Sequence, residues 1–286
     1  MELYYEPRNE AMKKITKVDG EPEMTEFESA FLCGLIKENR PKKILEIGVA
    51  AGGTTAILMQ CISDLELNDT EIFSVDLNKK YYRGDGRDTG FLGVEMEKQM
   101  PKVRHEFILG KVIPDVIEQI GGGIDLVVLD TVHSLPGEVL DFPVFLPFLS
   151  KNAIVVLHDV AYQHYNERGG FATQTLLDVA TGDRIVPMGM DKNRPTKLAN
   201  IAAIRVNDDT KKYIDAVFYS MTLPWVYIPD KDQLDSYGGF YKKYYSKEMV
   251  DIYNTAIELN KKSIIPQPLS LKKRIRRIGR VIIRGY

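Results

Sequence analysis

Runs of apolar residues alternate with amphipathic stretches along the chain as far as about residue 206. The runs are nearly continuous Val, Ile and Leu, which is typical of strands buried on both faces of a parallel sheet. The predicted strands are 42–48, 71–77, 103–110, 124–130, 152–160 and 199–206. Apolar residues at helical spacing predict helices at 24–38, 54–65, 91–100, 113–120, 138–150 and 172–180. We therefore predict an α/β fold, a doubly wound and mostly parallel sheet with helices on both faces.

The pattern changes after residue 206, because helical spacing continues there without further strand-like runs. We expect 1–206 to form the sheet domain, including an N-terminal helical segment. Thr25 and Glu28 are spaced as a capping box at the start of that segment's helix. We expect 207–286 to form a helical extension that packs on the sheet domain without a core of its own.

Composition excludes several classes of protein. Of the 286 residues, 44% are hydrophobic and the net charge is −2, so nothing in the totals favours a nucleic-acid partner. No stretch approaches the ~18 apolar residues of a membrane span, and the first residues lack an apolar signal core. Cys33 and Cys61 lie in apolar contexts without metal-site spacing, which predicts buried free thiols and a reducing compartment. We expect a cytoplasmic protein.

The basic C-terminal tail, 270–286, is an exception to the near balance of acidic and basic residues in the chain. It contains seven Lys and Arg residues and no acid, and its apolar residues recur on one helical stripe. Such a helix can lie on an anionic membrane, here the inner face. The same stripe could instead dock on the acidic body, within one chain or across a homo-oligomer. The sequence leaves both interpretations open.

Residues 44–55, ILEIGVAAGGTT, combine a carboxylate with a turn nearly stripped of side chains. A bare backbone at a helix N-terminus lets a ligand approach closely. Asp76 ends the next strand, where an acid commonly binds the two hydroxyls of a ribose. Glu46 lies two residues before the first glycine. Together these features predict a nucleoside site whose ligand carries positive charge near the turn.

Two cofactors fit this turn unequally. A nicotinamide dinucleotide favours G-x-G-x-x-G, whereas Gly48, Ala50 and Gly53 give G-x-A-x-x-G. S-adenosylmethionine favours an acid, a glycine two residues later and another four after that, which Glu46, Gly48 and Gly52 supply.

The second arrangement resembles motif I of the class I S-adenosylmethionine-dependent methyltransferases, and the resemblance covers about 24–206. It implies S-adenosyl-L-methionine as cofactor, with the motif I acid near its methionine moiety. Many members also carry a polar residue near the adenine after the third strand, where this chain has Leu109-Gly110-Lys111. The implied cofactor-binding residues are Glu46, Gly48, Ala50, Gly52, Thr54, Thr55, Asp76, Leu77, Lys111 and Asp130.

Histidines and aspartates meet at the ends of the fourth and fifth predicted strands. Asp130 and His133 follow the fourth, and His158 and Asp159 end the fifth. Since the carboxyl ends of parallel strands meet at one edge, these side chains should converge on the cofactor crevice. A histidine there can remove the proton from an attacking group. We predict His133 as the general base, with Asp130 also catalytic.

These strand ends resemble the metal-dependent small-molecule O-methyltransferases, which place an Asp after the fourth strand and Asp-Asn after the fifth. Asp130 and Asp159 match, but Val160 stands at the Asn position, so His158 is the expected third ligand of Mg²⁺ or another divalent cation. The Asp-x-x-His spacing resembles a branch that acts on sugars and glycosylated natural products.

The resemblance implies O-methylation of a hydroxyl on a sugar or glycan-linked small molecule. Two polar, glycine-containing loops, 81–91 and 165–173, are candidate lids over the pocket. The alternatives are an NAD-dependent oxidoreductase with a degenerate glycine motif, or an inactive nucleoside-binding protein.

Overall fold

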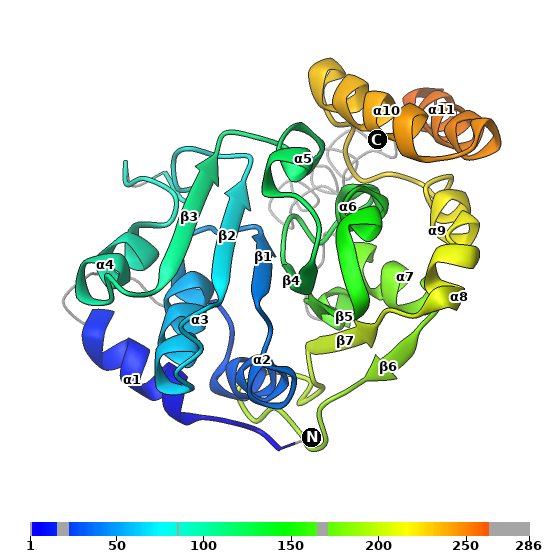
Figure 1. Cartoon of the computed structure of the whole chain (residues 1–286). Helices are drawn as coiled ribbons and strands as arrows, with labels where there is room; N and C mark the ends of the chain where they lie inside the picture. The colour runs from blue at the N-terminus through cyan, green and yellow to red at the C-terminus, as the bar shows by residue number, and fades with distance from the viewer. Residues whose placement is uncertain (1, 16–22, 85, 165–170, 263–286) are drawn as a thin grey trace, which may run out of the picture.

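The computed structural model describes residues 2–15, 23–84, 86–164 and 171–262. These residues form a seven-stranded sheet in the order β3-β2-β1-β4-β5-β7-β6 (Figure 1). The strands are β1 Lys43–Ile47, β2 Glu71–Asp76, β3 Arg104–Leu109, β4 Ile124–Leu129, β5 Leu149–His158, β6 Asp183–Ile185 and β7 Ile201–Arg205. Strands β1 to β5 pair in parallel, and β7 runs antiparallel to both neighbours. The predicted mostly parallel, doubly wound sheet is confirmed, and its order reverses between β1 and β4.

Helices cover both faces of this sheet. The α-helices are α1 Glu6–Ile15, α2 Glu26–Asn39, α3 Gly53–Asp64, α4 Phe91–Gln99, α5 Ile117–Ile120, α6 Gly137–Phe145, α7 Ala172–Val179, α8 Asp208–Lys212, α9 Asp215–Ser220, α10 Lys231–Tyr244 and α11 Lys247–Lys262. The 3₁₀ turns are η1 Ile113–Asp115, η2 Leu146–Phe148 and η3 Tyr162–His164. Helices α1 to α4 share one core cluster, whereas α5 to α7 and α9 to α11 share the other. Between these two layers the sheet is buried on both faces.

Several elements differ from the sequence prediction for local reasons. The helix predicted at 113–120 is two pieces, η1 and α5, because Pro114 opens a 3₁₀ turn. The helix predicted at 138–150 ends as α6 at Phe145, and β5 begins four residues later. Strand β6 escaped prediction because its three residues lack an apolar run. The capping box of Thr25 and Glu28 is confirmed.

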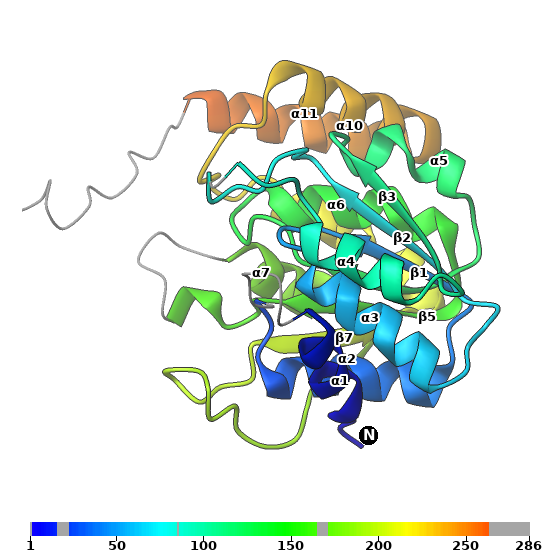
Figure 2. The ribbon, with the colours of Figure 1, turned by 90° about the vertical axis from the view of Figure 1, so that its left-hand side faces the viewer.

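The helical extension shares the core of the sheet domain. Leu234, Tyr237 and Tyr253 belong to the same apolar cluster as Val127 of β4 and Phe145 of α6. Both ribbon views place α10 and α11 along the edge of the molecule where α5 lies (Figures 1 and 2). In its described part, the extension therefore packs on the sheet as expected.

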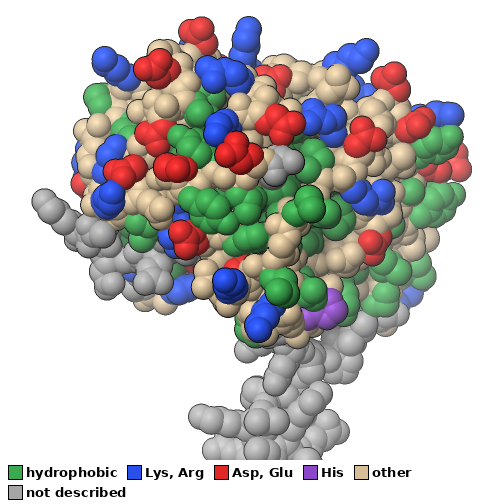
Figure 3. Space-filling model, turned by 90° about the horizontal axis from the view of Figure 1, so that it is seen from below, with side chains coloured by type: hydrophobic (Ala, Val, Ile, Leu, Met, Phe, Trp, Pro, Cys, Tyr) green, Lys and Arg blue, Asp and Glu red, His purple; other side chains and the backbone are tan. Residues whose placement is uncertain are grey.

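One face of the molecule mixes apolar and charged side chains. Figure 3 shows hydrophobic side chains gathered among acidic and basic ones on the face at the bottom of Figure 1.

The basic tail, 270–286, lies outside the described residues, so its membrane or docking role stays a prediction. Cys33 and Cys61 are buried free thiols, as predicted.

Across the described ranges, no helix combines the length and the apolar character needed to cross a membrane.

Candidate functional site

A cavity of about 1050 Å³ opens at the carboxyl ends of β1, β2, β4 and β5, at the point where the strand order reverses. Parallel α/β sheets bind ligands at this switch point. Its volume is at the upper end of the range for small-molecule sites, about 300–1,000 Å³. The predicted residues on its wall are Gly48, Ala50, Thr54, Asp76, Leu77, Lys111, Asp130, His133, His158 and Asp159.

The glycine turn is packed tightly against the end of β4. A Cβ atom on Gly48, whose φ is +92°, would lie 1.8 Å from the carbonyl oxygen of Asp130. One on Gly52, whose φ is +84°, would lie 2.9 Å from the Cα atom of Gly90. The sequence predicted glycines here for the approach of a ligand, but close backbone packing alone requires both.

Asp76 holds the turn while facing the cavity. Its Oδ2 atom accepts hydrogen bonds from the backbone N–H groups of Val49 at 2.9 Å and Ala50 at 3.1 Å. Its Oδ1 atom accepts one from the N–H of Asn78 at 2.7 Å. Each carboxylate oxygen can accept more than one hydrogen bond, so Asp76 can also bind ligand hydroxyls.

Glu46 lies beneath the turn and not on the cavity wall. Its Oε2 atom accepts a hydrogen bond from Thr55 Oγ1 at 2.7 Å and lies 2.5 Å from Ser74 Oγ, whereas Oε1 is buried without a partner. Burial raises the pKa of Glu46 to about 7. Gly52 and Thr55 are also absent from the wall. In this structure these three residues support the turn from below, and their direct contact with the cofactor stays a prediction.

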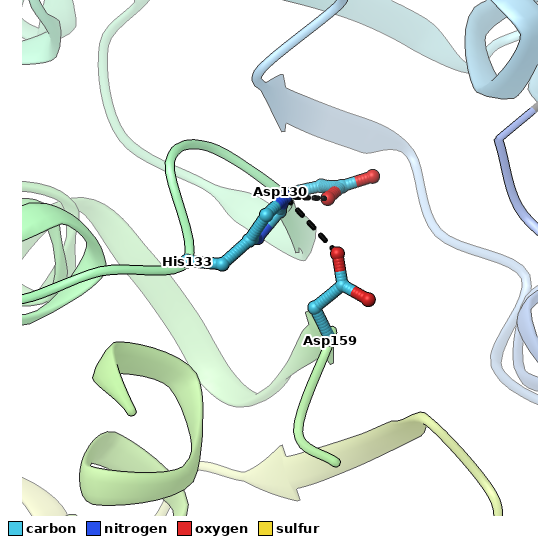
Figure 4. A group of neighbouring side chains, drawn as sticks. All are labelled: Asp130, His133 and Asp159. Carbon is cyan, nitrogen blue, oxygen red and sulfur yellow. Dashed lines mark ion pairs between the residues drawn. The ribbon is translucent and has the colours of Figure 1, made fainter. Parts of the chain in front are cut away.

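His133 lies between the two strand-end aspartates (Figure 4). Its Nε2 atom is 3.0 Å from Asp159 Oδ2 and 3.7 Å from Asp130 Oδ1. Glu138 accepts a hydrogen bond from the His133 backbone N–H at 2.7 Å and lies 3.4 Å from Nδ1. Burial lowers the pKa of His133, but the carboxylates of Asp159, Glu138 and Asp130 outweigh burial and raise it well above the ordinary value.

His158 lies beside both strand-end aspartates, as predicted. Its Nδ1 atom is 3.0 Å from Asp130 Oδ1 and 3.5 Å from Asp159 Oδ2, and its Nε2 atom is 3.2 Å from Glu28 Oε2. With both ring nitrogens facing protein carboxylates, His158 orients Asp130. Among the described residues, Asp130, His133 and Asp159 bring their candidate ligand atoms within 4.8 Å of one another. His133 is thus a further candidate ligand, and the predicted role of His158 as a cation ligand stays a prediction.

The candidate ligand atoms of Asp130, His133 and Asp159 fit a divalent cation that accepts both oxygen and nitrogen ligands. Two carboxylates and one imidazole suit Mn²⁺ or a similar transition ion better than Mg²⁺, which favours oxygen ligands. The Asn200 side-chain amide donates to Asp159 Oδ1, while its own carbonyl oxygen accepts from the Ala161 N–H at 2.9 Å. Asn200 thus orients Asp159 and is not a cation ligand. Nothing in the local sequence indicated it.

An ion pair closes one side of the cavity. Arg194, in the loop between β6 and β7, donates to both carboxylate oxygens of Glu28 at 2.7 and 2.6 Å. Burial raises the pKa of Glu28, but His158 and Arg194 more than compensate and bring it to about 2. Sequence analysis identified Glu28 only as a capping residue, so this connection was missed.

The helical extension builds the opposite wall. Tyr227, Gln233 and Tyr237 line the cavity together with Asp141 of α6. The Tyr237 hydroxyl donates to Asp141 Oδ1, and burial raises the pKa of Asp141 to about 7. The sequence predicted that the extension packs on the domain, but not that it contributes to the site.

The loop 81–91 reaches the cavity as predicted, through Arg83 and Arg87. Arg83 Nη2 and the Tyr82 hydroxyl both donate to Glu23 Oε1 at 2.8 Å, which ties the loop to the segment before α2. The second predicted lid, 165–173, lies mostly outside the described residues.

Solved structures with the same fold are methyltransferases or cofactor-bound proteins. The cofactor-bound Rv0187 from MTB has a TM-score of 0.52 and 16% identity over 70% of this chain and 89% of that one. The SAH-bound methyltransferase PaMTH1 from Podospora anserina has a TM-score of 0.51 and 16% identity over 71% and 88%. An O-methyltransferase from Bacillus cereus in complex with SAH has a TM-score of 0.50 and 13% identity over 70% and 91%. At such identities these likenesses establish the fold.

No curated protein matches the chain. The family described as "Methyltransferase domain" matches residues 45–160, which include the glycine turn, Asp76, Asp130, His133 and Asp159. Residues 45–160 therefore resemble a methyltransferase domain, and the strand order and the cavity at the switch point agree with the fold of the similar structures.

Proposed function

We propose that the chain transfers a methyl group from S-adenosylmethionine to a hydroxyl of a sugar or glycan-linked small molecule. One observation carries the proposal: the imidazole of His133 contacts two strand-end aspartates in the cavity that also holds the glycine turn and Asp76. A base beside a nucleoside site is the arrangement that O-methyl transfer requires. The SAH complexes of similar structures support this choice of cofactor.

Residues around the cavity can be assigned in turn to the methionine, ribose and adenine parts of S-adenosylmethionine. In the proposed arrangement, the backbone of the glycine turn receives the methionine moiety, Asp76 binds the ribose hydroxyls, and Lys111 lies near the adenine. The bound cofactor supplies an electrophilic methyl group on a sulfonium. The buried carboxylate of Glu46 beneath the turn favours such positive charge.

His133 performs the proton transfer in this proposal. Asp159 orients the imidazole through Nε2, and Glu138 fixes the backbone of the same residue. Because the neighbouring carboxylates raise the pKa of His133, the resting imidazolium must first lose its proton. The neutral ring then accepts the proton of the acceptor hydroxyl as the oxygen attacks the methyl group. The neighbouring carboxylates then stabilise the imidazolium, in the way that aspartates support catalytic histidines elsewhere.

A divalent cation would change the role of His133. A cation held by Asp130 and Asp159 would lower the pKa of the acceptor hydroxyl. Because His133 lies between these carboxylates, the cation site and the resting imidazolium occupy the same space. Activity in a chelator therefore separates a metal-assisted reaction from one in which His133 acts alone.

The wall opposite the glycine turn supports a polyhydroxylated acceptor. Tyr227 and Tyr237 offer aromatic surface and hydroxyls, and Gln233 and Asp141 offer further hydrogen-bonding groups. Arg83 lies on the same cavity. These are groups that bind sugar hydroxyls, whereas a flat apolar acceptor would leave buried polar atoms unpaired.

The test is turnover of S-adenosylmethionine with a panel of sugars and glycosides, measured as S-adenosylhomocysteine together with the mass of the product. We expect acceptor-dependent turnover and a product heavier by one methyl group. Parallel reactions contain EDTA, with and without added Mn²⁺. Binding of NAD in place of S-adenosylmethionine would instead support an oxidoreductase, and binding without turnover of any acceptor would support the inactive alternative.

Asp76→Ala should weaken S-adenosylmethionine binding by about 30- to 150-fold. The change removes a charged contact to the ribose worth ~2–3 kcal/mol, together with the hydrogen bonds that hold the turn. Isothermal titration calorimetry measures the affinity. Asp69→Ala, which removes an exposed charge just before β2 begins, is the matched control. Equal affinities for the two variants would contradict the assignment of Asp76.

A further inference from the structure

A continuous chain of hydrogen-bonding groups runs from the protein surface to the underside of the glycine turn. Half-exposed Glu97 of α4 lies 2.7 Å from His105 Nδ1, and His105 Nε2 lies 2.9 Å from Ser74 Oγ. Ser74 Oγ lies 2.5 Å from Glu46 Oε2, its partner in the β1–β2 register. The chain therefore crosses three adjacent strands, β3, β2 and β1.

Three close contacts in this chain require three protons. The Ser74 hydroxyl supplies one and a neutral His105 ring supplies another. If Glu97 and Glu46 were both carboxylates beside a neutral His105, two acceptors would face each other in one contact without a proton between them. A third proton is therefore needed, and it resides on Glu46 or on His105.

The ligand-free protein favours the first arrangement. Burial raises the pKa of Glu46 to about 7, and the charges of Asp130 and Asp76 act in the same direction. Burial lowers the pKa of His105, although Glu97 and Glu106 partly oppose it. Below pH 7 the proton accordingly lies mainly on Glu46, with Ser74 donating to His105 and His105 donating to Glu97.

We propose that Glu46, Ser74 and His105 form a proton relay that charges Glu46 when a positively charged ligand binds at the glycine turn. This inference rests on the proposed function, because S-adenosylmethionine brings an ammonium and a sulfonium to that position. Glu46 Oε1, buried and without a partner, is the free end of the relay on the side of the turn.

The transfer is balanced in protons. Glu46 Oε2 gives its proton to Ser74 Oγ, and the hydroxyl proton of Ser74 passes to His105 Nε2. Glu46 becomes a carboxylate, His105 becomes an imidazolium held by Glu97, and all three contacts keep a proton. Methyl transfer removes the sulfonium charge, which favours return of the proton to Glu46. His105 is in this sense a positioning residue that acts through Ser74.

Proton linkage in calorimetry tests the relay. S-Adenosylmethionine is titrated at pH 6.5, where its amino group stays protonated, in two buffers of different ionisation enthalpy. Wild type should release close to zero protons per ligand, because His105 keeps the proton. His105→Gln can bond to Ser74 but cannot accept the proton, so its release should approach one. Exposed His164 provides the matched control, His164→Gln, which should behave as wild type.

Equal proton release by wild type and His105→Gln, whether zero or one, would overturn the relay. A protein that does not bind S-adenosylmethionine would overturn the proposed function instead. The relay then retains an independent test in the ligand-free protein, by ¹⁵N NMR of the His105 ring. The ring should be neutral with its proton on Nδ1, which faces Glu97, and Nε2 should be bare toward Ser74. A proton on Nε2 would exclude the arrangement from which the transfer starts.

Discussion

Replacing His133 with alanine is expected to lower the rate of methyl transfer by ~10²–10⁴-fold, the contribution of a positioned general base. The imidazole of His133 lies 3.0 Å from Asp159 and 3.7 Å from Asp130, whereas His158, which also lies beside this pair, turns its second ring nitrogen to Glu28. Single-turnover rates with saturating S-adenosylmethionine measure the effect. Cofactor affinity should change little, because His133 contributes a proton acceptor and not a cofactor contact.

His164→Ala serves as the control for loss of a nearby imidazole, since His164 is exposed and belongs to the 3₁₀ turn that follows β5. A loss of less than about threefold in His133→Ala would exclude the role of base, because even weak general bases contribute more. If EDTA also abolishes wild-type activity and Mn²⁺ restores it, the imidazole acts as a cation ligand, and the His133→Ala rate should then equal that of the chelated wild type.

Gly48→Ala is expected to destabilise the protein by about 4 kcal/mol or more, the range of severe single substitutions. The new methyl group would lie 1.8 Å from the Asp130 carbonyl oxygen, and the φ of +92° is itself unfavourable for alanine. Relief requires β1 and β4 to separate at the switch point. Urea unfolding measures the loss of free energy, and the site should fail together with the fold.

Gly123→Ala is the matched control for this substitution. Gly123 also has a positive φ, +79°, but a Cβ atom there would meet nothing within 4 Å. Only the backbone strain of about 1–2 kcal/mol applies. Similar unfolding midpoints for the two variants would show that strand separation at Gly48 is easy, contrary to the packing described above.

The parallel strands and the strand-end acids could be predicted because both depend on short-range pattern. Asp76 and Asp130 each end an apolar run, and a parallel sheet brings such ends to one edge. The choice between His133 and His158 could not be predicted in the same way. His158 ends its strand buried between Asp130 and Glu28, whereas His133 returns toward the aspartates through a left-handed backbone with φ of 59°.

Long-range partners were beyond the reach of the sequence for a physical reason. Asn200 orients Asp159 and Arg194 pairs with Glu28 across loops whose course is determined by packing, not by local propensity. Tyr237 illustrates the same point. Its helical spacing predicts a buried face, but which residue that face meets, Asp141 of α6, depends on how α10 docks.

Residues that meet around the cavity are far apart in the sequence, and this affects the order in which parts of the protein fold. Glu28 and Arg194 are 166 positions apart, and the Tyr237–Asp141 contact spans 96. Contacts between such distant segments form late, because closing long loops costs entropy before the contact compensates for it. During synthesis the glycine turn emerges early, yet the cavity stays open until α10 has left the ribosome. Nascent chains should therefore acquire the sheet well before they acquire a site able to enclose a ligand.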